Sequence, residues 1–259
     1  METLPLLCFT WGLKQDYIPH ENIVQETSIV CASWMVLGED KTPKSVSILD
    51  DQSRFKKSVY DDTHCVKELH QVISDADILL GQNADRFDLP TLQSRATLIG
   101  LPPLQQKDSI DTLKEAKKVF RLPSHKLDFM ARFFLNEKKM DTGGMRLWLD
   151  ILQRDYPTVG ETPDPAKAEK AIKKMVRYNK RDVKLTADLY EAIKPYMKRH
   201  PNVRMYNDGE GCPRCGSKNI KKRGVRVRMN GKFQTYKCRD CLGWFSSSLS
   251  EGRDHIKVG

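Results

Sequence analysis

The stretch Tyr178-Asn179-Lys180-Arg181-Asp182 decides how this sequence is interpreted. On a helix, a spacing of four residues places the Tyr178 phenol and the Asp182 carboxylate on one face, about one turn apart. Cleavage of a phosphodiester by two metal ions needs acidic oxygens to hold the ions and a donor to orient the attacking water. The pair alone also fits a packed tyrosine beside a solvated aspartate, so its meaning depends on the rest of the chain.

A second motif lies earlier in the chain, from Asn83 to Asp88. The apolar run 78–80 before it predicts a short buried strand, and residues 89–92 after it predict the start of a helix with proline near its first turn. In α/β folds, the loop between the end of a strand and the start of a helix presents reacting groups. The sequence therefore predicts an α/β fold whose site combines both motifs.

With both motifs present, the chain resembles the DnaQ-like 3′–5′ exonucleases of the RNase H-like superfamily, in the branch whose third motif is Tyr-x-x-x-Asp. The exonuclease domain of family B DNA polymerases and stand-alone phage exonucleases are similar to it. The other branch would have a histidine where this chain has Arg177. The residues that match the second and third motifs are Asn83, Phe87, Asp88, Tyr178 and Asp182. The resemblance implies an RNase H-like mixed sheet flanked by helices.

The first motif of that family, Asp-x-Glu, is incomplete here. Glu2 and Thr3 match its Glu-Thr, while its aspartate and the strand leading to it would lie before Met1. Three explanations stay open: a start codon assigned too late, a truncated chain, or a natural remnant that binds nucleic acid without cutting it. As printed, the sequence predicts a metal site that lacks one carboxylate.

The resemblance implies catalysis by Mg²⁺ or Mn²⁺, two ions per site, held by Glu2, Asp88 and Asp182. Hard divalent cations prefer oxygen ligands and would neutralise the clustered negative charge. One ion would activate the attacking water and the other would stabilise the departing 3′ oxygen. Tyr178 would orient the water, since a phenol with a pKa of about 10 is a poor general base at neutral pH. Asn83 and Phe87 are expected to contact nucleic acid.

Four cysteines near the C-terminus form two Cys-x-x-Cys pairs, Cys212 with Cys215 and Cys238 with Cys241. Two close pairs of thiolates are the ligand set of one structural Zn²⁺ in a zinc ribbon. Disulfides or a redox site are the alternative. A glycine follows each pair, at Gly216 and Gly243, and both are expected to adopt the positive φ that a turn around a metal favours.

Most of the net charge of +10 lies from residue 209 onward. This concentration predicts that the ribbon holds a polyanion backbone, although basic residues on a strand also serve solubility. The basic residues expected to contact nucleic acid are Lys221, Lys222, Arg223, Arg226 and Arg228. Four aromatic residues could stack on bases or pack around the zinc: Phe233, Tyr236, Trp244 and Phe245.

Local patterns predict strands at 29–36, 45–49, 78–81 and 109–112, and a helix over about 63–74. Asp111 either caps the following helix or binds metal, with capping favoured. Asn230-Gly231 predicts a hairpin turn. We divide the chain into an exonuclease domain at 1–200, a linker at 201–210 and a basic zinc ribbon at 211–259.

The composition limits where the protein works. No apolar run approaches the roughly 20 residues that span a bilayer, and the N-terminus lacks the features of a signal peptide. An odd number of cysteines, seven in all, argues for a reducing compartment. The sequence predicts a cytoplasmic protein with no membrane partner, located in the bacterial host if a phage encodes it.

Two functions stay open. The first is a metal-dependent 3′–5′ exonuclease that the ribbon holds on its substrate, with DNA favoured over RNA. Its expected partner is nucleic acid, single-stranded or 3′-ended DNA, together with replication or recombination proteins. The second is a nucleic-acid-binding or accessory protein that keeps the nuclease scaffold with an incomplete metal site.

Overall fold

The computed structural model describes residues 1–14, 16–206, 209–229, 231–248 and 256–257. By its internal contacts the chain divides into two compact units. Unit 1 comprises residues 1–76, 86–106 and 139–184, and unit 2 comprises 77–85, 107–138 and 185–259. Both units therefore draw on segments that are far apart in the sequence. The division at 1–200, 201–210 and 211–259 was drawn from composition and stays a prediction.

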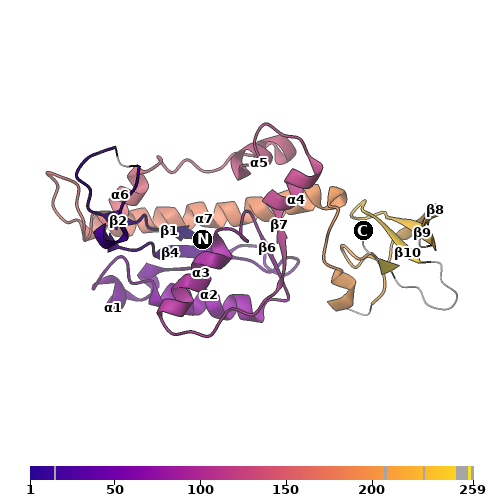
Figure 1. Cartoon of the computed structure of the whole chain (residues 1–259), viewed down its shortest axis with the longest axis horizontal. Helices are drawn as coiled ribbons and strands as arrows, with labels where there is room; N and C mark the ends of the chain where they lie inside the picture. The colour runs from indigo at the N-terminus through magenta and orange to yellow at the C-terminus, as the bar shows by residue number, and fades with distance from the viewer. Residues whose placement is uncertain (15, 207–208, 230, 249–255, 258–259) are drawn as a thin grey trace. The chain divides into compact units, whose positions relative to one another are not determined.

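Unit 1 is built on an antiparallel sheet of three strands in the order β1 (Glu2–Thr3), β4 (Ile29–Trp34) and β5 (Lys44–Ser47) (Figure 1). Glu2 pairs with Cys31, which in turn pairs with Ser47. The first four residues of β4 are fully or almost fully buried, as expected for its run of β-branched and small apolar side chains. This strand fixes the position of Glu2.

Helices pack against this sheet. The apolar positions of α2 (Thr63–Asp75) recur at helical spacing, so that Cys65, Val66 and Leu69 enter one core with β4. The remaining helices of unit 1 are α1 (Gln52–Phe55), α3 (Asp88–Leu98), α6 (Arg146–Leu152) and the larger part of α7 (Pro165–Ile193).

A buried ion pair joins three of these elements. Asp62, 1% exposed, accepts a hydrogen bond from the Ile29 backbone N–H at 2.8 Å and bonds from Arg95 Nε and Nη2, both at 2.8 Å. Because a buried carboxylate is stable only when it is paired and hydrogen-bonded, this arrangement ties α3 and the start of α2 to β4.

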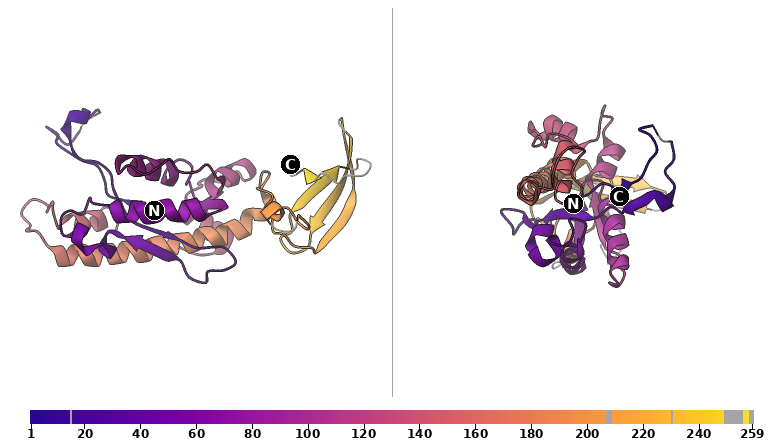
Figure 2. Two further views of the ribbon diagram at one scale, coloured as in Figure 1. Left: turned by 90° about the horizontal axis from the view of Figure 1, so that it is seen from below. Right: turned by 90° about the vertical axis from the view of Figure 1, so that its left-hand side faces the viewer.

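The hairpin of β2 (Leu7–Cys8) and β3 (Ile23–Gln25) belongs to unit 1. Figure 2 shows the loop between these strands standing away from the rest of the unit. Its large apolar side chains are exposed, with Trp11 at 100% and Leu13 at 106% of their reference areas.

The first part of unit 2 is the parallel pair β6 (Ile78–Gly81) and β7 (Asp108–Asp111) with its helices. The helices are α4 (Thr112–Val119), α5 (Leu127–Leu135) and the end of α7, followed by a 3-10 turn η3 (Lys194–Tyr196). Ile110, Met130, Leu185 and Leu189 are among the buried residues of their common core.

The second part of unit 2 is a four-stranded antiparallel sheet in the order β11-β10-β9-β8. Its strands are β8 (Ile220–Arg228), β9 (Gly231–Cys238), β10 (Trp244–Ser248) and β11 (Ile256–Lys257). A 3-10 turn η4 (Val203–Tyr206) precedes it. Pairing of Arg228 with Gly231 closes the expected hairpin, whereas Asn230 lies outside the described residues.

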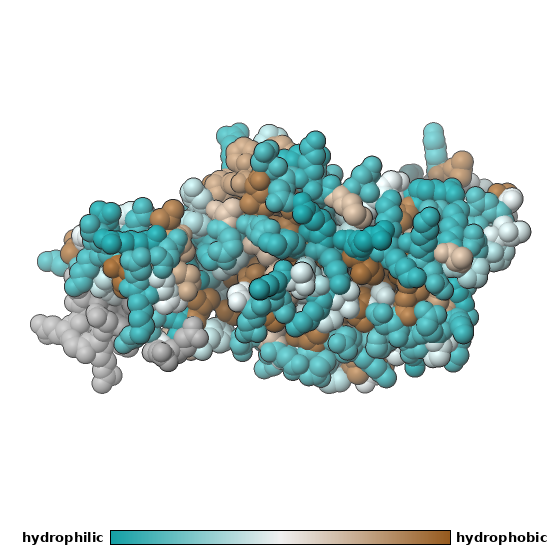
Figure 3. All heavy atoms as spheres, turned by 180° about the vertical axis from the view of Figure 1, so that it is seen from behind, coloured by the Kyte–Doolittle hydropathy of each residue, from teal (hydrophilic) through white to brown (hydrophobic). Residues whose placement is uncertain are grey.

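The α/β fold class is confirmed, and the expected helix and the strands β6 and β7 form within a residue or two of their predicted bounds. The two expected strands at 29–36 and 45–49 end early. Strand β5 stops at Ser47 because Ser47 and Asp50 form a capping box that starts a 3-10 turn. None of the described helices is long and apolar enough to cross a membrane. The face visible in Figure 3 is mainly hydrophilic, with apolar residues in small groups.

Candidate active site

The predicted catalytic residues come from three elements of unit 1. Tyr178 and Asp182 lie on α7, Glu2 lies on β1, and Asp88 is the first residue of α3. The Tyr178 hydroxyl is hydrogen-bonded to the Asp182 carboxylate, so the two side chains do share one helix face. Asn179 Nδ2 of the same helix donates to Glu2 Oε1 at 3.4 Å, which places β1 beside α7.

Burial and like charge act on these carboxylates together. Burial raises the pKa of Glu2, and the charge of Asp182 raises it further. Burial also raises the pKa of Asp182 above its ordinary value. Two carboxylates that are costly to ionise in one place favour the arrival of a cation.

One cation already present is the ammonium group of Met1. Its nitrogen lies 2.8 Å from Asp88 Oδ1, and its charge also lowers the cost of ionising Glu2 and Asp182. In this chain the three predicted carboxylates therefore share one cationic neighbour.

The second cation, Lys139, was not predicted. Its Nζ lies 2.5 Å from Asp182 Oδ2 and 4.9 Å from the centre of the Tyr178 ring. Burial lowers the pKa of Lys139, but hydrogen bonds to Asp182 and Tyr178 outweigh this and raise it above its ordinary value. Nothing in the sequence marks this residue, because it stands in a polar stretch beside Lys138 and is remote from both motifs.

These residues fit a hard divalent cation in their chemistry. All three carboxylates offer oxygen, which Mg²⁺ and Mn²⁺ prefer. Asn179 adds a donor to Glu2 Oε1 at 3.4 Å, and its own Oδ1 is buried without a hydrogen-bond partner among the described residues. The three carboxylates are not gathered as closely as the ligands of a filled site, because ammonium groups separately engage Asp88 and Asp182.

Asn83 and Phe87 are placed in different units. Phe87 precedes α3 in unit 1 and is 41% exposed. Asn83 lies in unit 2, in the left-handed region with φ 63°, and its backbone N–H donates to Asp111 Oδ1 at 3.0 Å.

Asp111 caps a helix, as the sequence favoured. Its Oδ1 accepts from the backbone N–H groups of Leu113 at 3.0 Å and Lys114 at 3.3 Å, at the start of α4. Its Oδ2 accepts from the Asp85 N–H at 3.4 Å. With both oxygens bonded to backbone and 2% exposure, Asp111 organises the loop that carries Asn83.

The four cysteines of the ribbon form the group of described residues best arranged for a metal ion. Their Sγ atoms all lie within 4.8 Å of one another. Cys212 and Cys241 are 3.7 Å apart at sulfur, as are Cys215 and Cys238. A tetrahedron with zinc–sulfur bonds of about 2.3 Å has edges of about 3.8 Å, so the spacing suits Zn²⁺. A disulfide needs about 2.05 Å, and all seven cysteines are free.

The two glycines beside these cysteines have different roles. Gly216 has φ 72°, as expected for a turn around a metal. The same expectation for Gly243 is wrong. In the turn that carries Cys238 and Cys241, called here the second knuckle, the residue with positive φ is Leu242, at 60°. A Cβ at Gly243 would lie 3.0 Å from both Cδ and Nη1 of Arg214 and 3.3 Å from Cys241 Sγ. A side chain there would require Arg214 or Cys241 to shift by a few tenths of an ångström.

The Arg214 side chain passes close to Gly243 because it connects the turn that carries Cys212 and Cys215, the first knuckle, to the end of α7. Its Nη1 donates to the carbonyl oxygens of Lys194 at 3.1 Å and Pro195 at 2.7 Å, and its Nη2 donates to that of Met197 at 2.6 Å. A guanidinium at the C-terminal end of a helix satisfies carbonyl groups that lack partners and opposes the helix dipole. The cysteine cluster is thereby attached to α7.

The basic and aromatic residues of the ribbon separate by exposure. Every described residue of β8 is exposed, including all five basic residues predicted to contact nucleic acid. Phe233 and Phe245 are buried, and Tyr236 stacks on Phe245 with ring centres 5.3 Å apart, so these three pack inside the ribbon. Trp244 is the exception at 49% exposure.

Comparison with known proteins shows a family match. The sequence model of the RNase H superfamily matches residues 24–194, more than half of the chain. No curated protein matches the chain. The matched range contains Asp88, Tyr178 and Asp182, while Glu2 and the four cysteines lie outside it.

Proposed function

The chain belongs to the RNase H superfamily, whose members are generally nucleases, and from this premise we propose that it is a metal-dependent 3′–5′ exonuclease. The observation that carries the proposal is the grouping of Tyr178, Asp182 and Glu2 in one partly buried acidic site. DNA is the proposed substrate in preference to RNA. The pattern Tyr-x-x-x-Asp on α7 supports the tyrosine branch of the DnaQ-like exonucleases.

Glu2, Asp88 and Asp182 would hold two Mg²⁺ or Mn²⁺ ions. When bound, such ions supply an activated water and stabilise the departing 3′ oxygen. The chain itself contributes orientation. Tyr178 donates its hydroxyl hydrogen bond to Asp182, and burial raises the pKa of the phenol, which stays protonated at neutral pH. A protonated phenol suits the positioning of a water and does not suit proton abstraction.

Lys139 has a part in the same site. Because its ammonium lies 2.5 Å from Asp182, it lowers the pKa of that carboxyl group and so opposes the effect of burial in the absence of metal. A divalent ion that binds Asp182 must displace or share this contact. Lys139 therefore sets how much the site favours the metal-bound form over the metal-free form.

The same ion pair favours a second candidate function. If Lys139 remains on Asp182, that carboxylate keeps a cationic partner without metal. The chain would then be an accessory protein that binds nucleic acid through the basic ribbon and cuts nothing.

The two candidates are separated by Asp88→Ala and Asp182→Ala, assayed for Mg²⁺- or Mn²⁺-dependent hydrolysis of single-stranded DNA. The assay is run on the chain and on the chain with an aspartate joined to Met1, because the first motif of the family is Asp-x-Glu. The Met1 nitrogen lies beside Asp88, so an aspartate joined there would lie at the site.

We expect both substitutions to abolish hydrolysis. Glu169→Ala, on the same helix, should leave hydrolysis unchanged; within the described part of the chain its carboxylate pairs with Lys173 at 3.8 Å. Activity of both site variants within about tenfold of the parent would reject the assigned carboxylates, since the loss of one metal-holding group should cost far more.

A further inference from the structure

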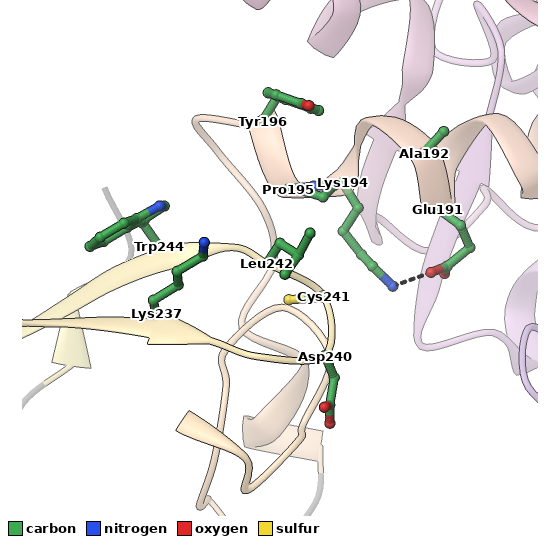
Figure 4. Close-up of a pocket in the computed structure, with 10 residues that line it drawn as sticks. All are labelled: Glu191, Ala192, Lys194, Pro195, Tyr196, Lys237, Asp240, Cys241, Leu242 and Trp244. Carbon is green, nitrogen blue, oxygen red and sulfur yellow. Dashed lines mark hydrogen bonds and ion pairs between the residues drawn. The ribbon is translucent and has the colours of Figure 1, made fainter. Parts of the chain in front are cut away.

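A pocket of about 580 Å³ lies in unit 2, where the end of α7 meets the second cysteine knuckle (Figure 4). This volume is in the range of sites that hold small organic groups. Residues of the helix end, of η3, and of β9, β10 and the turn between them line it: Glu191, Ala192, Lys194, Pro195, Tyr196, Lys237, Asp240, Cys241, Leu242 and Trp244.

Three large apolar side chains of this lining are exposed. Tyr196 is 57% exposed, Leu242 53% and Trp244 49%. Trp244 differs in this respect from Phe233 and Phe245, which are buried within the ribbon. The Tyr196 ring packs edge-on against Phe120, with ring centres 5.3 Å apart, so Trp244 is the ring on which a flat, unpaired base can stack.

The charged groups of the lining leave one cation available. Lys194 Nζ is bound to Glu191 Oε2 at 2.6 Å, and the Asp240 carboxylate accepts from Ser217 at 2.5 Å and Asn219 at 2.8 Å. Figure 4 shows the Asp240 carboxylate directed away from the two rings. Lys237 makes no ion pair within the described part of the chain, and its Nζ lies 5.8 Å from the centre of the Trp244 ring.

Strand register connects this pocket with the basic strand. On β9, Lys237 pairs with Trp244 of β10 on one side and with Lys221 of β8 on the other. Directly paired residues of antiparallel strands place their side chains on the same face of the sheet. An aromatic ring and two lysines thus form one row that runs from the pocket to β8.

We propose that this pocket binds an unpaired base of a nucleic-acid strand whose phosphates lie along Lys237 and Lys221. The proposal rests on the nucleic-acid ligand proposed above, assigns its contact to the ribbon and specifies it as a single strand. The base stacks on Trp244, Tyr196 lines the helix side of the pocket, and the row of lysines directs the backbone across the sheet toward β8. Selection of an unpaired base is what a grip for a single-stranded 3′ end requires.

The test measures affinity by fluorescence anisotropy with the zinc-loaded full chain and a labelled oligo(dT), with Ca²⁺ replacing Mg²⁺ to limit hydrolysis. Trp244→Ala should weaken binding about 5- to 150-fold, the range for one lost stacked base. Its salt dependence should match that of the parent, because no charge is lost. Lys237→Ala should instead lower the salt slope by about 0.7, the value for one contact with a single strand.

An oligonucleotide of equal length with abasic sugars separates stacking from damage to the ribbon. The parent should bind it about as weakly as Trp244→Ala binds oligo(dT), and Trp244→Ala should lose little more on it. Trp244→Phe should recover most of the affinity for oligo(dT). The matched control is Trp11→Ala, which removes a fully exposed tryptophan of unit 1 and should leave the affinity unchanged.

The proposed base-binding pocket would be contradicted if Trp244→Ala bound oligo(dT) as tightly as the parent does. It would also be contradicted if the substitution weakened binding to the abasic strand as much as binding to oligo(dT). These results would leave the proposed function standing if the parent still bound and shortened DNA. A parent chain that binds no nucleic acid would overturn both proposals.

Discussion

Two opposing effects act on the Asp182 carboxylate: hydrogen bonds favour its ionised form, and burial disfavours it. Lys139 and Tyr178 hydrogen-bond its carboxylate, yet burial prevails and its pKa is raised, as is that of Glu2. A carboxyl group with a raised pKa in the folded state stabilises that state at pH values below its unfolded pKa of about 4, and the contribution is lost as pH rises through the folded pKa. The metal-free site is therefore a source of instability at neutral pH.

Asp182→Asn tests this directly, because asparagine mimics the protonated carboxyl group. The melting temperature of the metal-free variant should exceed that of the parent by a margin that grows as pH rises from about 4 to 7. Mn²⁺ should reduce this difference in melting temperature, because it should bind and stabilise the parent alone. Glu169→Gln on the same helix provides the control. A margin that shrinks with rising pH would contradict the assigned burial cost.

Tyr178 is expected to act through its hydroxyl group alone. Tyr178→Phe keeps the ring against the core and removes the hydrogen bond, so turnover on DNA should fall roughly ten- to a thousandfold with little change in substrate binding. Single-turnover rates and anisotropy measured in parallel would separate the two effects. An unchanged rate would mean that Tyr178 is a packing residue.

At this scale the sequence predicted the pairs that depend on local spacing. Tyr178 with Asp182, and Asp111 with the start of α4, follow from helix geometry. Lys139 was missed because its contact with Asp182 spans more than forty residues of chain and obeys no local period. The reason given for Gly243 was wrong because the space it leaves is needed by Arg214, a residue of the other knuckle.

Among the elements, the ribbon with its four cysteines is the one whose folding we expect to depend most on a bound metal. Apart from Phe233, which is also buried, its described core is two buried cysteines and Phe245, with Cys215, Tyr236 and Cys241 packed against them. This is too little apolar surface for a domain of its size to fold alone. A bound Zn²⁺ would supply the missing stability, since metal-binding energy becomes folding energy in such sites.

We expect one zinc ion per chain, released by the double substitution Cys212→Ser and Cys215→Ser and unaffected by Cys8→Ser. Loss of zinc should also free the end of α7 from Arg214, so amide exchange should accelerate at residues 194–197 as well as in β9. Metal analysis and hydrogen exchange of the purified variants would show this. Full zinc content in the double variant would exclude the four-thiolate site.

Helix α2 and strands β6 and β7 were predictable because their apolar residues follow a regular period. The pairing of the strands could not be predicted from the sequence in the same way. Nothing local indicates that Lys237 lies between Lys221 and Trp244, because register depends on contacts that form only in the folded chain.

In the whole molecule, the predicted catalytic residues and the exposed basic strand belong to different units. The acidic residues of the site lie in unit 1, whereas the exposed basic strand lies in unit 2. The family match covers residues 24–194 and ends before the ribbon. Substrate affinity and bond cleavage should therefore respond to different substitutions.

The double substitution Lys221→Ala and Lys222→Ala should weaken binding to single-stranded DNA and lower the salt slope by up to about 1.4, or 0.7 per lost contact. The rate of a single turnover at saturating DNA should change little. Lys56→Ala with Lys57→Ala removes two exposed charges from unit 1 and serves as the matched control. An equal loss in both double variants would mean that net charge, and not the ribbon, sets the affinity.

The most direct test of the central claim is a time course of the chain, with and without an aspartate joined to Met1, on single-stranded DNA labelled at its 5′ end. With Mg²⁺ or Mn²⁺ we predict a ladder of labelled products that shorten step by step from the 3′ end, absent with Asp182→Asn. Release of the label as a mononucleotide at the earliest times, an identical ladder from Asp182→Asn, or intact DNA with both forms of the chain would contradict a 3′–5′ exonuclease at this site.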